Sequence, residues 1–339
     1  MTTAIVKRDV TAMTIAGQVA NQYAASGAFA DYTGRKSDNT LRAQRADLAT
    51  WSVYLCAATN GAACPDAETL QYDPAAWQGV TWGLVAGFVK WMLSEGYAVG
   101  TVNRHLATVK VYCRMASQAG AIDATDAAMI RSVQGYGGKD ARRIDERRET
   151  TRKGAKKALA VSISNEQATA LKMQPDTPQG RRDAVIMALL LDHGLRVGEL
   201  TALLVTAFDL RSGTFTFYRP KVGKTQTHRL TPDAARSIKA WFRHDALAIG
   251  ALLRGSRKGG ALTDAGMSER AITERVRVLG EAVGVTGLSA HDCRHYWATR
   301  AASQGTDPFA LRDAGGWTSL AMPSRYVEAS AIANERVKL

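Results

Sequence analysis

The sequence predicts a mainly α-helical protein of two domains, with a small antiparallel β-sheet in the second domain. Its 339 residues suit two domains, because one domain typically spans roughly 100–200 residues. Apolar residues recur at helical spacing along most of the chain. The segment 208–231 differs: the strand formers Phe215, Phe217 and Tyr218 precede a turn around Gly223.

The first half is expected to hold a flexible tail over 1–30 and an all-helical domain over 31–134. The tail is rich in Ala, Thr and Gly. Behind it, Ser37 provides a helix cap ahead of apolar residues at helical spacing. Further helices are expected over 80–94, from Thr101 and over 123–130, with a loop over 57–77.

A basic segment over 135–158 is expected to link the two domains. Between 139 and 157 it carries nine Lys or Arg and four Asp or Glu, and it has almost nothing apolar to bury. A charge run of this kind can be a solvated face. It can equally contact a nucleic-acid backbone, because its sign matches that of the whole chain.

The second domain is expected over 159–339. Ser164 and Gln167 form a capping box for its first helix. A strongly apolar helix over 181–193 ends at Gly194. After the sheet, helices resume at Pro232.

Composition points to a soluble, cytoplasmic protein that binds polyanions. Lys and Arg number 44 against 31 Asp and Glu, a net charge of +13, which attracts nucleic acid. The four cysteines form no CxxC pair, so a zinc site or a disulfide framework is not expected. The N-terminus has no secretory signal, and the densest apolar run is too short to cross a bilayer.

Three separated segments carry polar residues suited to phosphate chemistry. In the first, Arg196 follows the glycine that ends an apolar helix, and Glu199 lies one helical turn later. A guanidinium held by a carboxylate is oriented for bidentate phosphate binding. In the second, His291 and Arg294 share a helix face near its N-terminus, where anions bind readily. The third segment, around Gly315-Gly316, contains Trp317 and, nine residues later, Tyr326.

Each segment alone also fits a structural role, as an ion pair, a His–Arg pair or a packed tyrosine. Their order and spacing together resemble the tyrosine recombinase, or phage integrase, family over nearly all of 159–339. The resemblance implies that Tyr326 is the nucleophile. It also implies that Trp317 stands at the family's second histidine, as in the Cre recombinase. The remaining family positions match Arg196, Glu199, His291 and Arg294.

The family also places a lysine on a β-hairpin. Lys224, eight residues before Pro232, fits that position, and Lys221 remains an alternative because hairpin registers are easily misread. His193 and His295 match no catalytic position and are expected to have packing or helix-end roles. Cys293 stands where the family usually has Leu and is expected to be apolar and unreactive.

The resemblance implies strand exchange in double-stranded DNA through a 3′-phosphotyrosine and a Holliday junction, with four protomers on two sites. Lys224 would protonate the leaving 5′-oxygen and His291 would assist at the nucleophile, because an indole N–H such as that of Trp317 cannot shuttle a proton. No GxxxxGK(S/T) loop or carboxylate cluster is present. Neither a cofactor nor a metal is therefore expected.

Several alternatives stay open. A type IB topoisomerase uses the same chemistry, a telomere-resolving relative is usually larger, and an inactive relative would only bind DNA. Within recombinases, a mobile-element or phage integrase is favoured, but a dimer resolvase is not separated from it. The helical domain resembles the family's core-binding domain, through Thr40-Leu41-Arg42 and the stretch from Thr101 to Leu106. The segment after Tyr326, with Ile332 and Val337, is expected to dock on a neighbouring protomer.

Overall fold

The computed structural model describes residues 11–62, 64–147, 153, 160–246 and 248–330. The chain divides into two compact units, Met1–Ala158 and Leu159–Leu339. The expected docking segment that contains Ile332 and Val337 lies outside the described residues.

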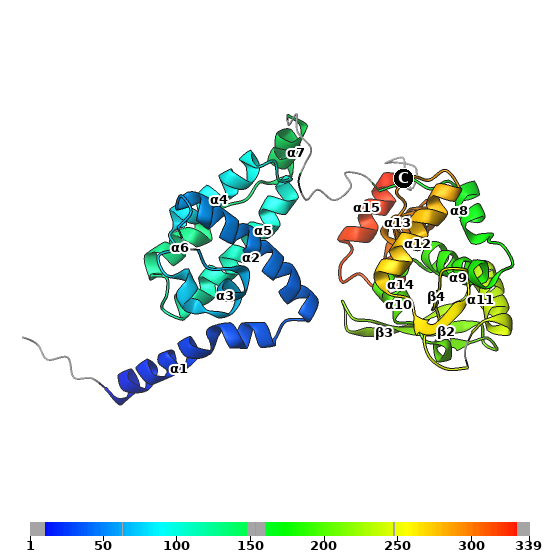
Figure 1. Cartoon of the computed structure of the whole chain (residues 1–339), viewed down its shortest axis with the longest axis horizontal. Coiled ribbons are helices and arrows are strands. Elements are labelled where there is room, and N and C mark those ends of the chain that lie inside the picture. The colour runs from blue at the N-terminus through cyan, green and yellow to red at the C-terminus, as the bar shows by residue number, and fades with distance from the viewer. Residues whose placement is uncertain (1–10, 63, 148–152, 154–159, 247, 331–339) are drawn as a thin grey trace, which may run out of the picture. The chain divides into compact units, whose positions relative to one another are not determined.

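The first unit is helical throughout its described elements (Figure 1). Its core is aromatic: Trp51 stacks on Trp77 with ring centroids 6.2 Å apart, and Phe88 meets Trp51 edge-on at 5.0 Å. Tyr112 extends the stack on the other side of Trp77. The elements are α1 (Ala12–Gly34), α2 (Asp38–Ala58), α3 (Ala67–Tyr72), η1 (Pro74–Trp77), α4 (Trp82–Ser94), α5 (Val99–Gln118), α6 (Ala124–Ser132) and α7 (Gly138–Glu146).

The prediction of a flexible tail over 1–30 is wrong for residues 12–30, which belong to helix α1. Alanine is the strongest helix former, and Thr11 caps the first turn. The end of α1 is anchored by Phe29, which is buried and packs edge-on against Tyr112. High Ala content was therefore a helix signal and not a sign of disorder.

Two further expectations need correction. The predicted loop over 57–77 contains α3 and η1, which Asp66 and Asp73 cap at their N-termini. The predicted linker contains the short helix α7, and its Lys153 pairs in a β-bridge with Tyr97. Capping residues explain α3 and η1, since they satisfy backbone donors that a loop would leave open, whereas α7 has no side-chain cap.

The second unit surrounds a helix that is buried on all sides. Every side chain from Val185 to Leu191 in α9 is buried, as the continuous apolar run requires. The helices are α8 (Asn165–Lys172), α9 (Pro178–His193), α10 (Val197–Thr201), η2 (Val205–Ala207), α11 (Pro232–His244), α12 (Glu269–Ala282), α13 (Ala290–Ser303), α14 (Pro308–Gly315) and α15 (Ala321–Ser330).

The predicted sheet is confirmed as a three-stranded antiparallel sheet in the order β1–β2–β3. Its strands are β1 (Phe208–Asp209), β2 (Thr214–Arg219) and β3 (Lys224–Arg229). In Figure 1, β2 and β3 run along one edge of this unit. A second pair, β4 (Arg254–Ser256) with β5 (Leu262–Gly266), was not predicted.

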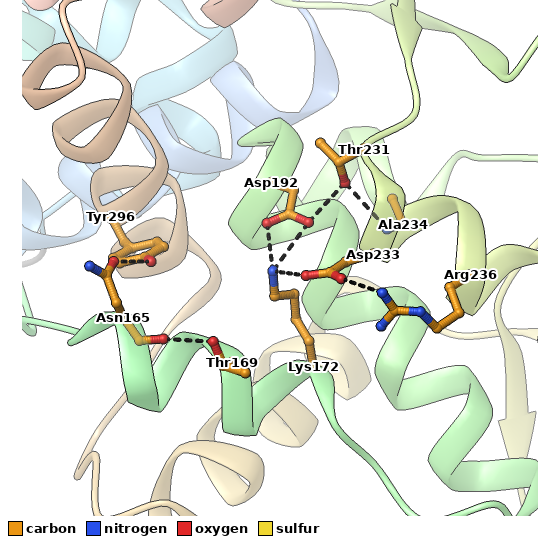
Figure 2. A network of polar contacts seen from close by, with 9 residues as sticks. All are labelled: Asn165, Thr169, Lys172, Asp192, Thr231, Asp233, Ala234, Arg236 and Tyr296. Atoms are coloured by element: carbon orange, nitrogen blue, oxygen red, sulfur yellow. Dashed lines mark hydrogen bonds and ion pairs between the residues drawn. The ribbon is translucent and has the colours of Figure 1, made fainter.

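A polar network fixes the C-terminal end of α9 (Figure 2). Lys172 Nζ at the end of α8 lies 3.0 Å from Asp192 Oδ1 and also pairs with Asp233 on α11. Thr231 donates from Oγ1 to Asp192 Oδ2 at 2.9 Å. Burial lowers the pKa of Lys172, but the two carboxylates outweigh that effect and raise it overall. The network therefore steadies the point where the chain leaves α9 for Arg196.

None of the helices in the part of the chain that the structure describes is long and apolar enough to cross a membrane.

Candidate active site

The turn after α9 brings Arg196 to the start of α10. Gly194 has φ +59°, and a Cβ there would lie 2.3 Å from Trp297 Cε3, so the turn requires glycine. Glu199 accepts from the Arg196 backbone N–H at 2.9 Å and from its guanidinium at 2.7 Å. One carboxylate therefore both caps the helix and orients the arginine.

A second arginine, Arg219 at the end of β2, shares that carboxylate. Its side chain is fully buried and donates to Glu199 Oε2 at 2.8 Å. It also donates to the Ala314 carbonyl at 2.7 Å and packs so closely under Gly316 that a Cβ there would lie 2.5 Å from Arg219 Cδ. Sequence reasoning missed Arg219. A usable signal was present, because Arg219 continues the buried alternation of Phe215 and Phe217 with a charged residue.

Arg294 on α13 ties the three sequence segments together. Its guanidinium donates to the Gly194 carbonyl of the first segment and to the Gly315 carbonyl of the third. It lies 4.5 Å from the ring centroid of Trp317. Burial lowers the pKa of Arg294 to about 9, and the nearby Arg196 and Arg219 act in the same direction.

The site has excess positive charge. Among the described residues, the guanidiniums of Arg196, Arg219 and Arg294 interact electrostatically with one another and with the carboxylate of Glu199. Arg196 is about a quarter exposed, whereas Glu199 is buried. Buried cations in excess of their carboxylate favour an anion in the same place, such as a phosphate whose charge grows during reaction.

Tyr326 on α15 lies beside this cluster. The residue is 7% exposed, and its ring centroid is 5.9 Å from that of Trp317. Burial raises the pKa of Tyr326, while the positive charge of Arg294 acts against that rise. Trp317 therefore contacts both Arg294 and Tyr326.

The hydroxyl of Tyr326 meets a residue that the sequence interpretation set aside. His295 Nδ1 lies 2.8 Å from Tyr326 Oη. His291, one turn earlier on α13, is exposed, and its Nε2 lies 3.1 Å from His295 Nε2. His295 thus stands between His291 and the tyrosine. Its position directly after Arg294 was a signal that could have found it.

Of the two candidate hairpin lysines, the strand register places Lys224 beside the site. Lys224 pairs with Arg219, and directly opposed residues of antiparallel strands project from the same face. Gln226 on that face donates to the Asp313 carbonyl at 2.6 Å, which ties β3 to the end of α14. Lys221 lies in the turn between the strands. Both lysines are exposed.

Two other residues considered in the sequence, His193 and Cys293, are packed in the interior of this unit. His193 is buried and meets the Phe215 ring edge-on at 5.0 Å. Cys293 is fully buried, and burial raises the pKa of its thiol, which agrees with an unreactive residue.

Comparison with known proteins identifies the family. The model of the phage integrase family matches residues 162–331, half of the chain. The chain is 26% identical over 299 residues to tyrosine recombinase XerC of Xanthomonas axonopodis pv. citri, covering 86% of each. It is 25% identical over 277 residues to tyrosine recombinase XerD of Pseudomonas aeruginosa, covering 80% of each.

The fold is also found among solved structures. A lambda integrase dimer bound to a COC′ core site matches with a TM-score of 0.58 at 15% identity, over 92% of this chain and 96% of that chain. The family match covers the segments that carry Arg196, Arg294 and Tyr326. The chain therefore belongs to the phage integrase family and is a tyrosine recombinase.

Proposed function

We propose that this enzyme cuts and rejoins double-stranded DNA at specific sites, with Tyr326 as the nucleophile. The observation that carries the proposal is the tyrosine hydroxyl beside a buried excess of guanidinium charge. A phosphodiester in this place would have its developing negative charge stabilised without further groups. Whole-chain charge of +13 favours the same substrate.

The chemistry assigns a role to each group. Tyr326 Oη attacks the phosphorus, the bond to the 5′-oxygen breaks, and a 3′-phosphotyrosine forms. Arg196 and Arg294 bind the non-bridging oxygens, and Glu199 holds Arg196 in place. The leaving 5′-oxygen takes a proton from Lys224. A 5′-hydroxyl from a second strand reverses these steps, and reciprocal exchange gives a Holliday junction.

Trp317 and His291 have the two remaining roles in the proposed reaction. The Trp317 ring packs against Tyr326 and Arg294, and its N–H can donate to a phosphate oxygen. His291 handles protons on the nucleophile side. Neither a cofactor nor a metal has a role in this scheme.

The wider assembly that we propose is the one typical of the tyrosine recombinase family. Residues 31–134 form a core-binding domain, the basic segment 135–158 links it to the catalytic domain over 159–339, and four protomers assemble on two recombination sites. The lambda integrase structure, which contains core-site DNA, supports a duplex ligand. We place the protein in the cytoplasm, in contact with the nucleoid, and assign it the integrase role of a mobile element or phage.

The test uses nicked duplexes that tile the DNA flanking the gene. A nick close to the cleavage point lets the short leaving strand diffuse away and traps the covalent complex on a denaturing gel. We expect a covalent band with EDTA present. Tyr326→Phe should abolish the band, and Tyr218→Phe, an exposed tyrosine on β2, should keep it.

Three other outcomes would each favour a different nucleophile or a different function. A band that survives in Tyr326→Phe would identify a different nucleophile. Tight DNA binding with no covalent band on any duplex would favour the inactive relative. Relaxation of supercoiled plasmid without joining of paired sites would favour the type IB topoisomerase.

A further inference from the structure

The nucleophile is hydrogen-bonded to an imidazole of a neighbouring helix. Tyr326 Oη and His295 Nδ1 are 2.8 Å apart, and the two ring centroids are 5.5 Å apart. His295 comes from α13 and Tyr326 from α15, so packing of the two helices creates the contact. A proton acceptor so close to an attacking hydroxyl meets the geometric requirement for a general base.

The contact continues to the surface through a second imidazole. His295 Nε2 lies 3.1 Å from His291 Nε2. If Nδ1 of His295 accepts the phenol proton, its Nε2 carries hydrogen and donates to His291. Tyr326 is buried while His291 is exposed. The two rings therefore form a path from the buried hydroxyl to solvent.

The groups around His295 favour its neutral form, which a general base requires. Burial lowers the pKa of His295, Asp292 on the same helix raises it, and Arg294 lowers it. The cavity beside His295 is also lined by Arg300. A neutral imidazole therefore faces a phenol whose own pKa is raised by burial, so Tyr326 does not ionise without an acceptor.

We propose that His295 is a catalytic residue that takes the proton of Tyr326 during attack and returns it during rejoining, an inference that rests on the proposed function. As the bond from Tyr326 Oη to phosphorus forms, the phenolic proton moves to His295 Nδ1. The bond from phosphorus to the 5′-oxygen breaks, and that oxygen takes its proton from Lys224. His291 then relays charge between His295 and solvent and does not contact the nucleophile itself.

The experiment measures single-turnover formation of the covalent complex on the nicked duplex that reacts with the wild type. His295→Ala should slow cleavage by about 10²–10³-fold. His295→Asn retains a polar atom near the position of Nδ1 but is no base, so it should be slow as well. Tyr296→Phe removes the hydrogen bond of the next residue on α13 to Asn165 and should keep the wild-type rate. DNA affinity and thermal midpoint identify variants that merely fail to fold.

A second substrate separates the two proton transfers. A duplex with sulfur in place of the bridging 5′-oxygen has a leaving group that needs no proton. It should restore the rate of Lys224→Ala and leave His295→Ala slow. The wild-type rate should also rise with pH through the lowered pKa of His295, and His295→Ala should lack that limb.

The outcomes are distinguishable from failure of the proposed function. Absence of a wild-type band, or a band in Tyr326→Phe, would overturn the function and this inference together. A Tyr326-dependent band that forms at full rate in His295→Ala would overturn the inference alone. Full recovery in His295→Asn would replace proton transfer with simple positioning of the phenol.

Discussion

Asp47 in the helical unit and Glu199 in the catalytic unit are both buried carboxylates among basic groups, and the two sites differ in charge balance. In the helical unit, Asp47 accepts from Thr108 Oγ1 at 2.7 Å and forms an ion pair with Arg104, which is half exposed. Burial lowers the pKa of the neighbouring His105, so that ring adds little positive charge. In the catalytic unit, Glu199 interacts with guanidiniums in excess of its own charge.

This difference separates a structural ion pair from a reactive site. Asp47 and Arg104 balance each other, so the site needs no further ion. The arginines around Glu199 are not balanced within the protein, and two of them, Arg219 and Arg294, are buried. Burial of a charge is therefore weak evidence for function, whereas burial of unbalanced charge indicates an anionic ligand.

The largest expected effect comes from removing the carboxylate of the catalytic unit. Glu199→Gln leaves Arg219 buried without an opposing charge and should lower the free energy of unfolding by about 3–5 kcal/mol. Covalent complex formation should fall at least about 100-fold, because Arg196 also loses its anchor. Urea unfolding followed by tryptophan fluorescence gives the first quantity.

Asp47→Asn is the matched variant in the helical unit. It should lower the stability of that unit by a smaller amount, because the half-exposed Arg104 can turn to solvent. Covalent complex formation on the bound duplex should be unaffected. Equal losses of cleavage in the two variants would contradict the distinction between balanced and unbalanced sites.

The next effect concerns the lysine that protonates the leaving oxygen. Lys224→Ala should slow cleavage by about 10²–10⁴-fold, because Lys224 pairs with Arg219 on the face that contacts the site. Lys221 lies in the turn, two residues after the end of β2, so Lys221→Ala should stay near the wild-type rate. The nicked-duplex assay measures both variants, and a reversed ranking would make Lys221 the general acid.

The same comparison shows what could be predicted from sequence. Residues in short motifs of fixed order could be singled out from the sequence. In the structure Glu199 holds Arg196, and Trp317 contacts both Arg294 and Tyr326. The helical unit was harder, since alanine-rich α1 has little amphipathic pattern and is anchored near its end by contacts of Phe29 and Tyr32 with Tyr112.

The missed residues depend on contacts between segments far apart in the chain. Arg219 reaches Glu199, twenty residues away, and the Ala314 carbonyl, ninety-five residues away. His295 reaches Tyr326 because α13 and α15 pack together. Local signals could mark both residues as candidates, but the groups that they contact are decided by tertiary packing.

Acid should destabilise the catalytic unit through the buried His193 and the half-buried His228. Burial lowers the pKa of His193 and of His228 from 6.5 to about 4. The unfolded chain therefore binds protons first as the pH falls, and stability present above pH 6.5 is lost between pH 6.5 and 4. The full loss is roughly 3 kcal/mol for each histidine.

Urea unfolding at pH 7 and at pH 4.5 measures this effect. His193→Leu should reduce the pH dependence of stability by about half, because it removes one of the two histidines. The replacement breaks no hydrogen bond of Nε2, which has no partner within the described residues. His105→Leu in the helical unit should change it less, because Asp47 raises the pKa of His105 against the effect of burial. An unchanged slope in His193→Leu would mean that His193 is not buried in its neutral form.

The smallest expected effect tests the network of Figure 2, which holds the end of α9 without touching the site. Lys172→Met keeps the apolar stem but leaves Asp192 with Thr231 alone, and should lower the free energy of unfolding by about 1–3 kcal/mol. Arg236→Met is the matched control: Arg236 pairs with Asp233 in the same network but its side chain is 74% exposed, so the change should stay below about 0.5 kcal/mol. Cleavage by Lys172→Met should match the wild type below its unfolding temperature, since Arg196 and Arg219 are held by Glu199 and not by Asp192. A loss of cleavage without a loss of stability would place Lys172 in the active site and remove the distinction between the two kinds of buried charge.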